Sequence, residues 1–383
     1  MTAPAASGQR ALLGEDGLRE RVTRLAGIPD RGSASPGERE AAEYVAADLR
    51  EAGARDVTLE TAQVNGTYWW PVGIPTAAAA LAGLRGGALG AIVGALTTAS
   101  NVDDIRYGPR LLRRLLPKRE TTNVIAELGD PNGRNIVLVT AHHDSAHSGL
   151  VFHPDGVRWF PRHFPEQWEK TDTSPPTMWA AAAGPALVAL GSLLGSQLLR
   201  GAGVALSAGN TVAMADIALR DVVPGANDNA TAVAVLMSLA RGLADDPPPD
   251  TRVILLSTGS EESNQEGMIE FAKRHFADLP RERTKVICLD TVGSPKLIVL
   301  RGEGMLGIKE YSPQMHSLLT SCAADLGIDV FDRIRFRNAT DGIIALNGGY
   351  EAAMIASADE YRIGTNYHWP TDTADRIDYG TVA

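Results

Sequence analysis

The sequence of 383 residues is poor in cysteine, and this excludes several kinds of protein. Cys288 and Cys322 are too few for a disulfide scaffold, and they lack the paired spacing of a structural zinc site. We expect two reduced thiols, neither of them near a run that suggests a nucleophile. Hydrophobic residues make up 44% of the chain, which is ample for a large core and excludes a disordered or fibrous protein.

Positive charge is scarce as well. The chain has 36 Lys and Arg residues against 46 Asp and Glu residues, and the resulting net charge of -10 would repel a polyphosphate. We therefore expect no nucleic-acid partner. Residues 1–22 lack the apolar run that a secretory signal requires, so we expect no signal peptide. The predicted location is cytoplasmic, with the catalytic domain either free or attached to the inner face of the membrane.

Charged residues are almost absent from two long internal blocks. Thr61 to Val102 contains only Arg85, and Thr173 to Ala215 contains only Arg200. We interpret both blocks as parts of apolar helical insertions within a single domain that covers residues 14–383.

The first predicted insertion covers residues 61–118, and the second covers 150–222. Residues 177–199 are long enough to cross a hydrocarbon layer of about 30 Å, and 201–219 are able to return. Both ends of an insertion lie in the same domain, so the number of crossings must be even, as in a helical hairpin. Arginines and lysines between 106 and 119 favour a membrane. Ala-rich helices equally suit a soluble lid or a dimer interface, so both interpretations and the oligomeric state stay open.

Apolar runs of Val, Ile and Leu alternate with stretches of helical periodicity elsewhere in the chain. Ser35 and Pro36 begin a predicted helix that ends at Gly53, because a capping hydroxyl, an early proline and a final glycine mark its ends. Further helices are predicted at 228–244, 266–277 and 312–326, and strands at 56–61, 123–128, 135–141, 252–258, 285–290, 296–300 and 352–357. Such alternation indicates a sheet buried on both faces, which is an α/β fold.

Three of the predicted strands run directly into polar residues. His142 and Asp144 follow the strand at 135–141, Glu261 and Glu262 follow the strand at 252–258, and Asp290 ends a third. Ligands bind beyond the carboxyl ends of strands in open α/β sheets, so these side chains are expected to converge on one crevice. Asp228 at a helix start, where it is also a candidate cap, and His368 in a loop complete the set.

Clustered carboxylates raise one another's pKa, so such a crevice requires a cation. Two imidazoles and several carboxylates suit zinc, with manganese or cobalt as alternatives. In a two-metal site, one carboxylate bridges, and each ion takes one His and one further carboxylate. One member of the Glu261–Glu262 pair is then left to accept a proton from water. Asp144 is placed to accept a hydrogen bond from the second nitrogen of His142.

Five motifs, in order, resemble those of the M28 family of co-catalytic zinc aminopeptidases. They are His-His-Asp-Ser, Gly-Ala-Asn-Asp-Asn-Ala, Ser-Glu-Glu-Ser-Asn-Gln-Glu-Gly, Leu-Asp-Thr-Val-Gly and Asn-Tyr-His-Trp-Pro-Thr-Asp-Thr. The resemblance covers roughly residues 14–68, 120–150 and 222–380. It implies a three-layer α/β/α fold with a mixed, mostly parallel central sheet, and a reaction that removes the N-terminal residue from a peptide substrate.

The resemblance also implies a role for each candidate residue. The implied ligands of two zinc ions are His142, Asp228 and Asp290 for one ion, and Asp228, Glu262 and His368 for the other. Glu261 would be the general base, and Asp144 would orient an imidazole. The chain departs from the usual motifs at Ala232, Asn264 and Met268, none of which is a ligand position. These departures concern packing or specificity more than activity.

Two other functions stay open. One is a glutaminyl cyclase-like acyltransferase with one zinc ion, and the other is a non-catalytic membrane receptor, which should have lost metal ligands. Asp341 is either a turn residue or part of a substrate pocket. Four further histidines near the site in sequence are interpreted as solvated surface residues: His143, His147, His153 and His163.

Overall fold

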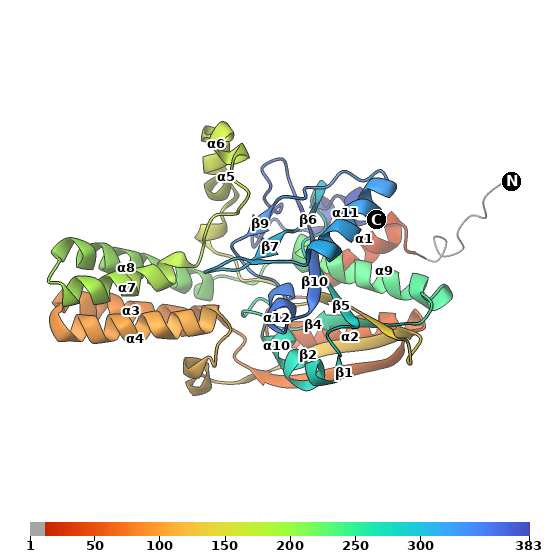
Figure 1. Cartoon of the computed structure of the whole chain (residues 1–383), viewed down its shortest axis with the longest axis horizontal. Helices are drawn as coiled ribbons and strands as arrows, with labels where there is room; N and C mark the ends of the chain where they lie inside the picture. Colours follow the sequence, from red (N-terminus) through yellow and green to blue (C-terminus); the bar gives the residue numbers. More distant parts are fainter. Residues whose placement is uncertain (1–11) are drawn as a thin grey trace.

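The structure of the chain is a computed structural model that describes residues 12–383 (Figure 1). Its centre is a seven-stranded sheet with the strand order β1-β2-β4-β3-β5-β10-β6. The strands are β1 (Arg55–Val64), β2 (Arg119–Gly129), β3 (Asn135–His142), β4 (Thr251–Thr258), β5 (Thr284–Leu289), β6 (Lys296–Val299) and β10 (Glu351–Ala358). All seven predicted strands are present. The predicted absence of a secretory signal rests partly on residues 1–11, which lie outside the described range.

The four central strands, β4, β3, β5 and β10, are parallel, whereas β2 and β6 run antiparallel to their neighbours. The register pairs His142 with Thr258, and Thr140 with Cys288. The carboxyl ends of β3, β4 and β5 therefore meet at one edge of the sheet. The predicted α/β class with a mixed sheet is confirmed.

Helices cover both faces of this sheet, and each face has its own apolar core. On one face lie α1 (Glu15–Ala26), α2 (Pro36–Glu51), α9 (Thr231–Asp245) and α13 (Tyr379–Val382), and on the other lie α10 (Glu266–His275) and α12 (Gly342–Asn347). Side chains alternate between the two cores along β3, with Val139 on the first and Leu138 on the second. The Ser35 hydroxyl accepts a hydrogen bond from the Glu38 amide and begins α2 as predicted.

Further elements connect these strands and helices. They are the strands β7 (Gly302–Glu303), β8 (Lys309–Glu310) and β9 (Arg335–Phe336), the helices α5 (Pro154–His163), α6 (Pro165–Glu169) and α11 (Pro313–Asp325), the π-helical turn η4 (Ala226–Ala230), and the 3-10 turns η2 (Leu111–Leu115), η3 (Leu150–Phe152), η5 (Phe276–Asp278) and η6 (Ala374–Arg376). The three short strands form a second sheet in the order β8-β7-β9.

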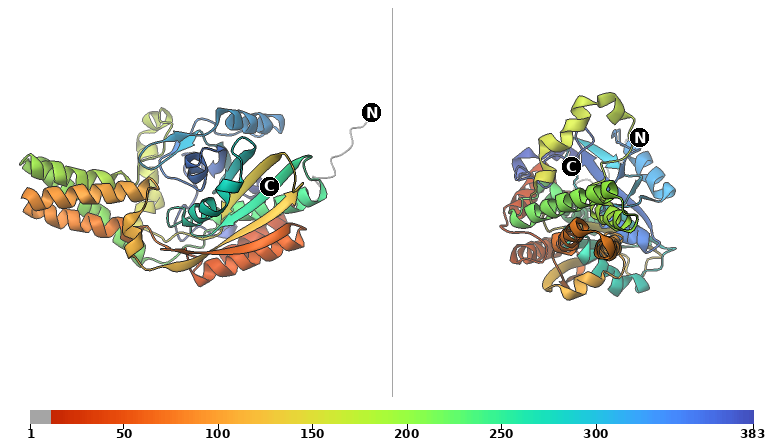
Figure 2. Two further views of the ribbon diagram at one scale, coloured as in Figure 1. Left: turned by 60° about the horizontal axis from the view of Figure 1, so that its bottom comes forward. Right: turned by 90° about the vertical axis from the view of Figure 1, so that its left-hand side faces the viewer.

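Four apolar helices form a separate bundle, which we call the arm. They are α3 (Trp69–Arg85), α4 (Gly87–Ile105), α7 (Trp179–Leu193) and α8 (Gln197–Leu219). The two hairpins pack side by side, with α3 against α8 and α4 against α7. Figures 1 and 2 show the arm projecting from the rest of the molecule, with the loops of both hairpins at its far tip.

Candidate metal centre

The carboxyl edge of the sheet brings all the predicted metal ligands together. His142 is the last residue of β3, Asp290 directly follows β5, and Glu262 lies on the turn after β4. Asp228 comes from η4, and His368 comes from the loop that follows β10. All except Glu262, which is partly buried, are buried. Elements far apart in sequence thus deliver two imidazoles and three carboxylates to one place.

Asp228 lies between the two imidazoles. Its Oδ1 is 3.2 Å from Nε2 of His142, and its Oδ2 is 3.1 Å from Nε2 of His368. A second carboxylate stands beside each imidazole: Asp290 Oδ2 is 3.8 Å from His142 Nε2, and Glu262 Oε2 is 3.2 Å from His368 Nε2. The result is two His-carboxylate groups that share one aspartate.

Asp144 supports the first of these groups from behind. Its Oδ1 is 3.3 Å from Nδ1 of His142, on the side of the ring away from Asp228. The backbone amides of Glu261 and Glu262 each donate a hydrogen bond to the Asp144 carboxylate, and the Ser33 hydroxyl donates a third. Asp144 therefore orients the imidazole and fixes the turn that carries the Glu pair.

The electrostatics of the cluster call for a cation. Burial raises the pKa of Glu261, Glu262 and Asp290, and the neighbouring carboxylates add to this effect. Burial lowers the pKa of His368, but Glu262 and Asp228 outweigh it and raise this pKa to about 10. A buried group of this kind is stable only when positive charge compensates the carboxylates.

The donor atoms fit divalent metal ions. Among the described residues, three groups of side chains place their ligand atoms within 4.8 Å of one another, and two of these groups are His142–Asp228–Asp290 and Asp228–Glu262–His368. Oε1 of Glu262 is buried and has no hydrogen-bond partner in the protein. Nitrogen and oxygen donors in this combination suit zinc, manganese or cobalt. The third group contains His142 with both Glu261 and Glu262, so Glu261 also lies near the first site.

Glu261 differs from Glu262 in its hydrogen-bond partners. Its Oε2 is 3.9 Å from His142 Nε2, while its Oε1 accepts a hydrogen bond of 2.5 Å from the Gln265 amide. The Tyr107 hydroxyl donates to the Gln265 carbonyl oxygen at 2.6 Å and so fixes that amide. One oxygen of Glu261 is thus held by the protein and the other faces the cluster, as a proton acceptor requires.

Three supporting residues were not predicted from the sequence. Asp372 accepts hydrogen bonds from the backbone amides of Asn227 and Asp228, and so holds the loop that presents Asp228. The buried Arg31 guanidinium donates to the carbonyl oxygens of His143 and Gly225. Gln265, the third of these residues, stands four positions after Glu261, and Asp372 lies in the motif of His368. Their positions in the sequence could have identified Gln265 and Asp372 as neighbours of the site. No comparable motif lies near Arg31.

Two sequence interpretations were wrong. His143 is not a solvated histidine, because it is fully buried, its Nδ1 is 2.9 Å from the Ser257 hydroxyl, and burial lowers its pKa to about 3. Asp228 does not cap a helix: α9 begins only at Thr231, because the Asp228 carboxylate faces the imidazoles instead of the helix. Asp341 is buried and accepts a hydrogen bond from Thr258, so it lies behind the crevice.

The other predicted surface histidines vary in burial. His147 is partly buried, and its Nδ1 is 2.7 Å from the backbone oxygen of Arg220. The ring of His153 lies 4.7 Å from that of Trp369, centroid to centroid, and His163 is exposed beside Trp159. None of the three belongs to a candidate metal group among the described residues.

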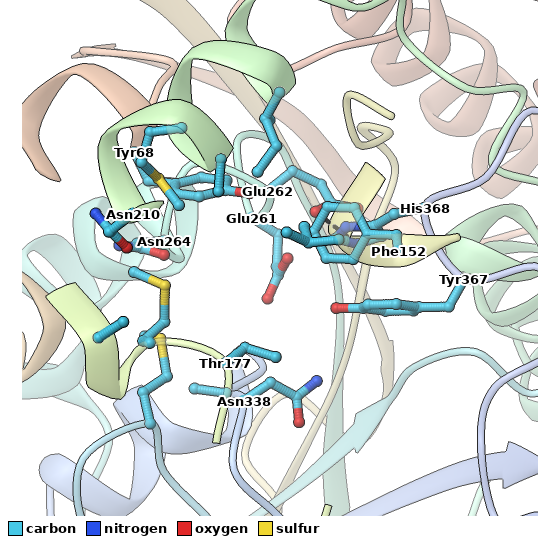
Figure 3. Close-up of a pocket in the computed structure, with 18 of the residues that line it drawn as sticks. Tyr68, Phe152, Thr177, Asn210, Glu261, Glu262, Asn264, Asn338, Tyr367 and His368 are labelled. Atoms are coloured by element: carbon cyan, nitrogen blue, oxygen red, sulfur yellow. Dashed lines mark ion pairs between the residues drawn. The ribbon is translucent and has the colours of Figure 1, made fainter. Parts of the chain in front are cut away.

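Two cavities meet at the cluster. The larger, of about 340 Å³, extends toward the base of the arm, and Figure 3 shows Glu261, Glu262 and His368 at its side. The smaller, of about 200 Å³, reaches Asp228 and Asp290. Apolar side chains line both: Met178, Met214, Ile217 and Met305 in the larger, and Val157, Phe336, Met354 and Ile363 in the smaller.

The family model described as Peptidase family M28 matches residues 211–383. This match confirms the resemblance that the motifs indicated. No curated protein sequence matches the chain.

Solved structures with a similar fold include both peptidases and glutaminyl cyclases. A Zn-dependent exopeptidase from Parabacteroides distasonis has a TM-score of 0.58 and 15% identity, with 96% of this chain and 94% of that chain covered. An aminopeptidase from Aneurinibacillus sp. strain AM-1 has a TM-score of 0.56 and 17% identity, with coverages of 98% and 91%. A glutaminyl cyclase from Bacteroides thetaiotaomicron, bound to N-acetylhistamine, has a TM-score of 0.58 and 14% identity, with coverages of 97% and 94%. At these identities the likeness establishes the fold.

Proposed function

We propose that the protein is a dinuclear metal-dependent exopeptidase that removes the N-terminal residue of peptides, because residues 211–383 match the model of peptidase family M28. The observation that carries the proposal is the position of Asp228, whose two oxygens face different imidazoles. A carboxylate in this position is able to serve two ions at once. A single-metal site has no need of the second imidazole and its own carboxylate.

The residues that would hold the ions are those of the two groups around Asp228. His142 and Asp290 would complete one site, and Glu262 and His368 would complete the other. Bound divalent cations supply Lewis acidity toward the scissile carbonyl and toward a water molecule. The cavities on either side of the cluster leave room for the substrate residues that flank the scissile bond.

Glu261 would move the proton. Its free oxygen faces the cluster while Gln265 holds the other, so it is placed to accept a proton from the attacking water. It would then deliver this proton to the nitrogen of the leaving amine. Burial, the largest cause, raises the pKa of Glu261 in the metal-free protein, and bound cations oppose that shift, so the carboxylate is available as a base near neutral pH.

The walls of the cavities suggest a substrate class. Three methionines and one isoleucine line part of the larger cavity, and Phe336, Met354 and Ile363 line part of the smaller. Apolar walls bind apolar side chains, because both surfaces then leave water. We therefore expect the protein to favour apolar residues on both sides of the scissile bond over acidic or basic ones.

Glutaminyl cyclase activity is the second candidate, because structures with that activity share the fold at similar TM-scores. The two reactions give different products from the same substrate. On glutaminyl-phenylalanine amide, a peptidase releases free glutamine, whereas a cyclase releases ammonia and leaves a pyroglutamyl peptide. A non-catalytic receptor, the third alternative, would give neither product and would not need a complete set of donors.

The test uses the purified full-length chain, metal analysis and a panel of dipeptide amides. We expect two metal ions per chain, release of free N-terminal residues, and loss of activity on chelation. Glu261→Gln should keep both ions and lose turnover by about 10²-fold or more, because an amide cannot accept the proton. One ion per chain with ammonia as product would establish the cyclase, and near-normal turnover of Glu261→Gln at full metal occupancy would remove Glu261 from its role.

A further inference from the structure

The arm exposes apolar side chains and buries polar ones, which is the opposite of the usual arrangement in a water-soluble protein. Large apolar side chains lie on its outer surface: Ile74, Leu81, Leu84, Ile92, Leu96, Leu190, Leu193, Leu194, Leu198 and Val212 are all between 50% and 82% exposed. Polar side chains lie inside, where Thr76, Thr97, Asn101, Ser207 and Asn210 are buried. A bundle in water would bury the first set and expose the second.

We propose that the arm spans a lipid bilayer, with its outer surface in the hydrocarbon layer. The rest of the described chain carries the large sheet and the candidate metal centre; this part, the catalytic core, would lie on the cytoplasmic side. The partner of this surface is therefore the acyl region of the membrane. This inference goes beyond the proposed function and does not depend on it, because none of the metal ligands lies in the arm.

The interior of the arm suits helices that associate in lipid. Small residues line the contacts between helices, and an added Cβ at Gly94 would lie only 2.7 Å from the backbone nitrogen of Ala189. Asn101 donates a hydrogen bond of 2.7 Å to the carbonyl oxygen of Ala181, and the hydroxyls of Thr76 and Thr211 are 3.0 Å apart. Close backbone approach and internal polar bonds hold helices together where no hydrophobic effect between them is available.

The dimensions of the arm match a bilayer. Its helices have 15 to 23 residues, or about 22 to 34 Å at 1.5 Å per residue, against a hydrocarbon layer of about 30 Å. Among the described residues, α8 is the one helix that satisfies both the length and the hydropathy expected of a membrane span, and only 28% of its most apolar stretch is buried. Low burial separates α8 from the core helix of a water-soluble protein.

The charges of the arm lie at its two ends. Arg85 and Arg200 stand close to the tip, and the Arg200 side chain lies against Gly86 in the α3–α4 loop. Long arginine side chains at this position can extend to the lipid headgroups. At the opposite end, the chain after α4 carries the exposed cations Arg106, Arg114, Lys118 and Arg119. Cations that directly follow a span favour the cytoplasmic side, which places the catalytic core there.

The surroundings of the base have the composition of a membrane interface. In Figure 1 the segment α5–α6 and the turn η2 lie on opposite sides of the base of the arm. The first exposes Trp159, Phe160 and Phe164, and the second exposes Leu111 and Leu115. Trp70 and Trp179, each 45% exposed, begin α3 and α7 at the same end. Aromatic side chains gather at the level of the headgroups in membrane proteins.

A second copy of the chain is the alternative occupant of this surface. A dimer contact would use one side of the arm, whereas exposed leucines and isoleucines occur on α3, α4, α7 and α8 alike. Because apolar side chains are exposed on all four helices, the arm is better suited to being surrounded by lipid than to a dimer contact on one side.

The first experiment separates membrane, aggregate and soluble protein. The full-length chain is expressed, its membranes are washed with alkaline carbonate, and the pellet is floated in a density gradient. We expect the protein to float with lipid after the wash. Recovery in the high-speed supernatant without detergent, as monomer or dimer, would overturn the proposal, as would protein that stays at the bottom of the gradient.

Matched variants test whether the exposed surface of the arm lies in the hydrocarbon layer. Ile74→Lys with Leu96→Lys puts charges on exposed positions near the middle of the arm, where water would accept them and hydrocarbon would not. We expect at least a tenfold lower floating fraction. The control pair is Leu318→Lys on α11 with Leu326→Lys directly after it. These leucines are 56% and 69% exposed in the wild type, and the control should float like the wild type. Equal flotation of both pairs would contradict burial of the arm in lipid.

Cysteine labelling reports on which side of the membrane each end of the protein lies. Cys322 is exposed on the catalytic core and Cys288 is buried, so a membrane-impermeant maleimide reads the core through Cys322. Gln197→Cys in a Cys322→Ser background reads the tip of the arm. In sealed vesicles we expect labelling of Cys322 from the cytoplasmic side and of the tip only from the other side. Labelling of both from one side would show that the arm does not cross.

Discussion

The catalytic core and the arm use the same kinds of residue in opposite ways. In the core, Leu138, Leu255 and Leu256 are buried under helices on the two faces of the sheet. In the arm, Leu194 and Leu198 are 72% and 82% exposed, while Asn101 is fully buried. Aliphatic content alone does not show what surrounds each region, because both regions are rich in aliphatic residues. The direction in which those residues face identifies the solvent that each region requires.

A buried ion cluster joins the two regions. Arg113 pairs with Asp104, at the base of α4, and its Nη1 lies 3.1 Å from Glu266 at the start of α10. The same guanidinium donates a hydrogen bond to the backbone oxygen of Ser263, directly after the Glu pair. The base of the arm is therefore linked to the turn that carries Glu261 and Glu262.

The largest expected effect concerns the core alone. Asp228→Ala should lose both metal ions and reduce turnover on the order of 10³-fold or more, because the shared carboxylate serves both sites. His368→Ala should mainly empty one site. Metal analysis of both purified variants checks this, and flotation of both should equal that of the wild type. If each variant kept one ion, Asp228 would not be a bridge.

The next effect concerns the link between the regions. Arg113→Met removes the guanidinium that pairs with the buried carboxylates of Asp104 and Glu266, and we expect it to lower the free energy of unfolding by about 3 to 5 kcal/mol. Urea titration in detergent measures this. The matched control is Arg114→Met, which removes an exposed neighbour and should change stability by less than about 0.5 kcal/mol. Similar losses in the two variants would mean that the cluster does not stabilise the junction.

A smaller effect tests the packing inside the arm. An added Cβ at Gly203 would lie 2.7 Å from the carbonyl oxygen of Gly184, so Gly203→Ala should destabilise the bundle by about 1 to 3 kcal/mol. Gly201 lies on the same helix with open space around it, so Gly201→Ala should instead stabilise α8 by up to about 1 kcal/mol. Thermal unfolding of both variants provides the comparison. Opposite signs are expected, and equal signs would refute the close packing of α7 and α8.

The smallest effect is a pH dependence within the core. Burial raises the pKa of the Glu303 carboxyl to about 8, although hydrogen bonds from Tyr311 and Thr340 oppose this. Its ordinary value is 4.5, so its contribution to stability is complete below about pH 4.5 and is lost as the pH rises through 8. Between pH 6 and 7 the free energy of unfolding of the wild type should therefore fall by about 1.4 kcal/mol more than that of Glu303→Gln. Identical slopes in urea titrations would show that Glu303 is not protonated in this range.

Local patterns were sufficient to predict the strands and the side chains that meet at the candidate metal centre. His142 and Asp290 end apolar runs, and parallel strands bring such ends together, so position along the sequence already implied proximity in space. The helix from Pro36 was equally predictable, because its signals lie within it. These features depend on neighbours in the chain.

Contacts between distant segments were beyond such patterns. Arg31 donates to the carbonyl oxygen of Gly225 across 194 positions, and no periodicity marks that pair. His143 is buried next to the neighbouring strand β4, where its hydrogen-bond partner Ser257 lies 114 positions away in the sequence. The two apolar blocks were predicted as hairpins, but the pairing of α3 with α8 follows from packing alone.

The hydrogen bonds of Asp372 have a consequence for the order of synthesis. The loop of Asp228 emerges from the ribosome 144 residues before the carboxylate that holds it. The first hairpin of the arm likewise waits for the second, since Asn101 bonds to an oxygen 80 residues later. Each region therefore lacks some of its contacts while the chain is being synthesised. The metal centre can be completed only after the loop that carries His368 has been made.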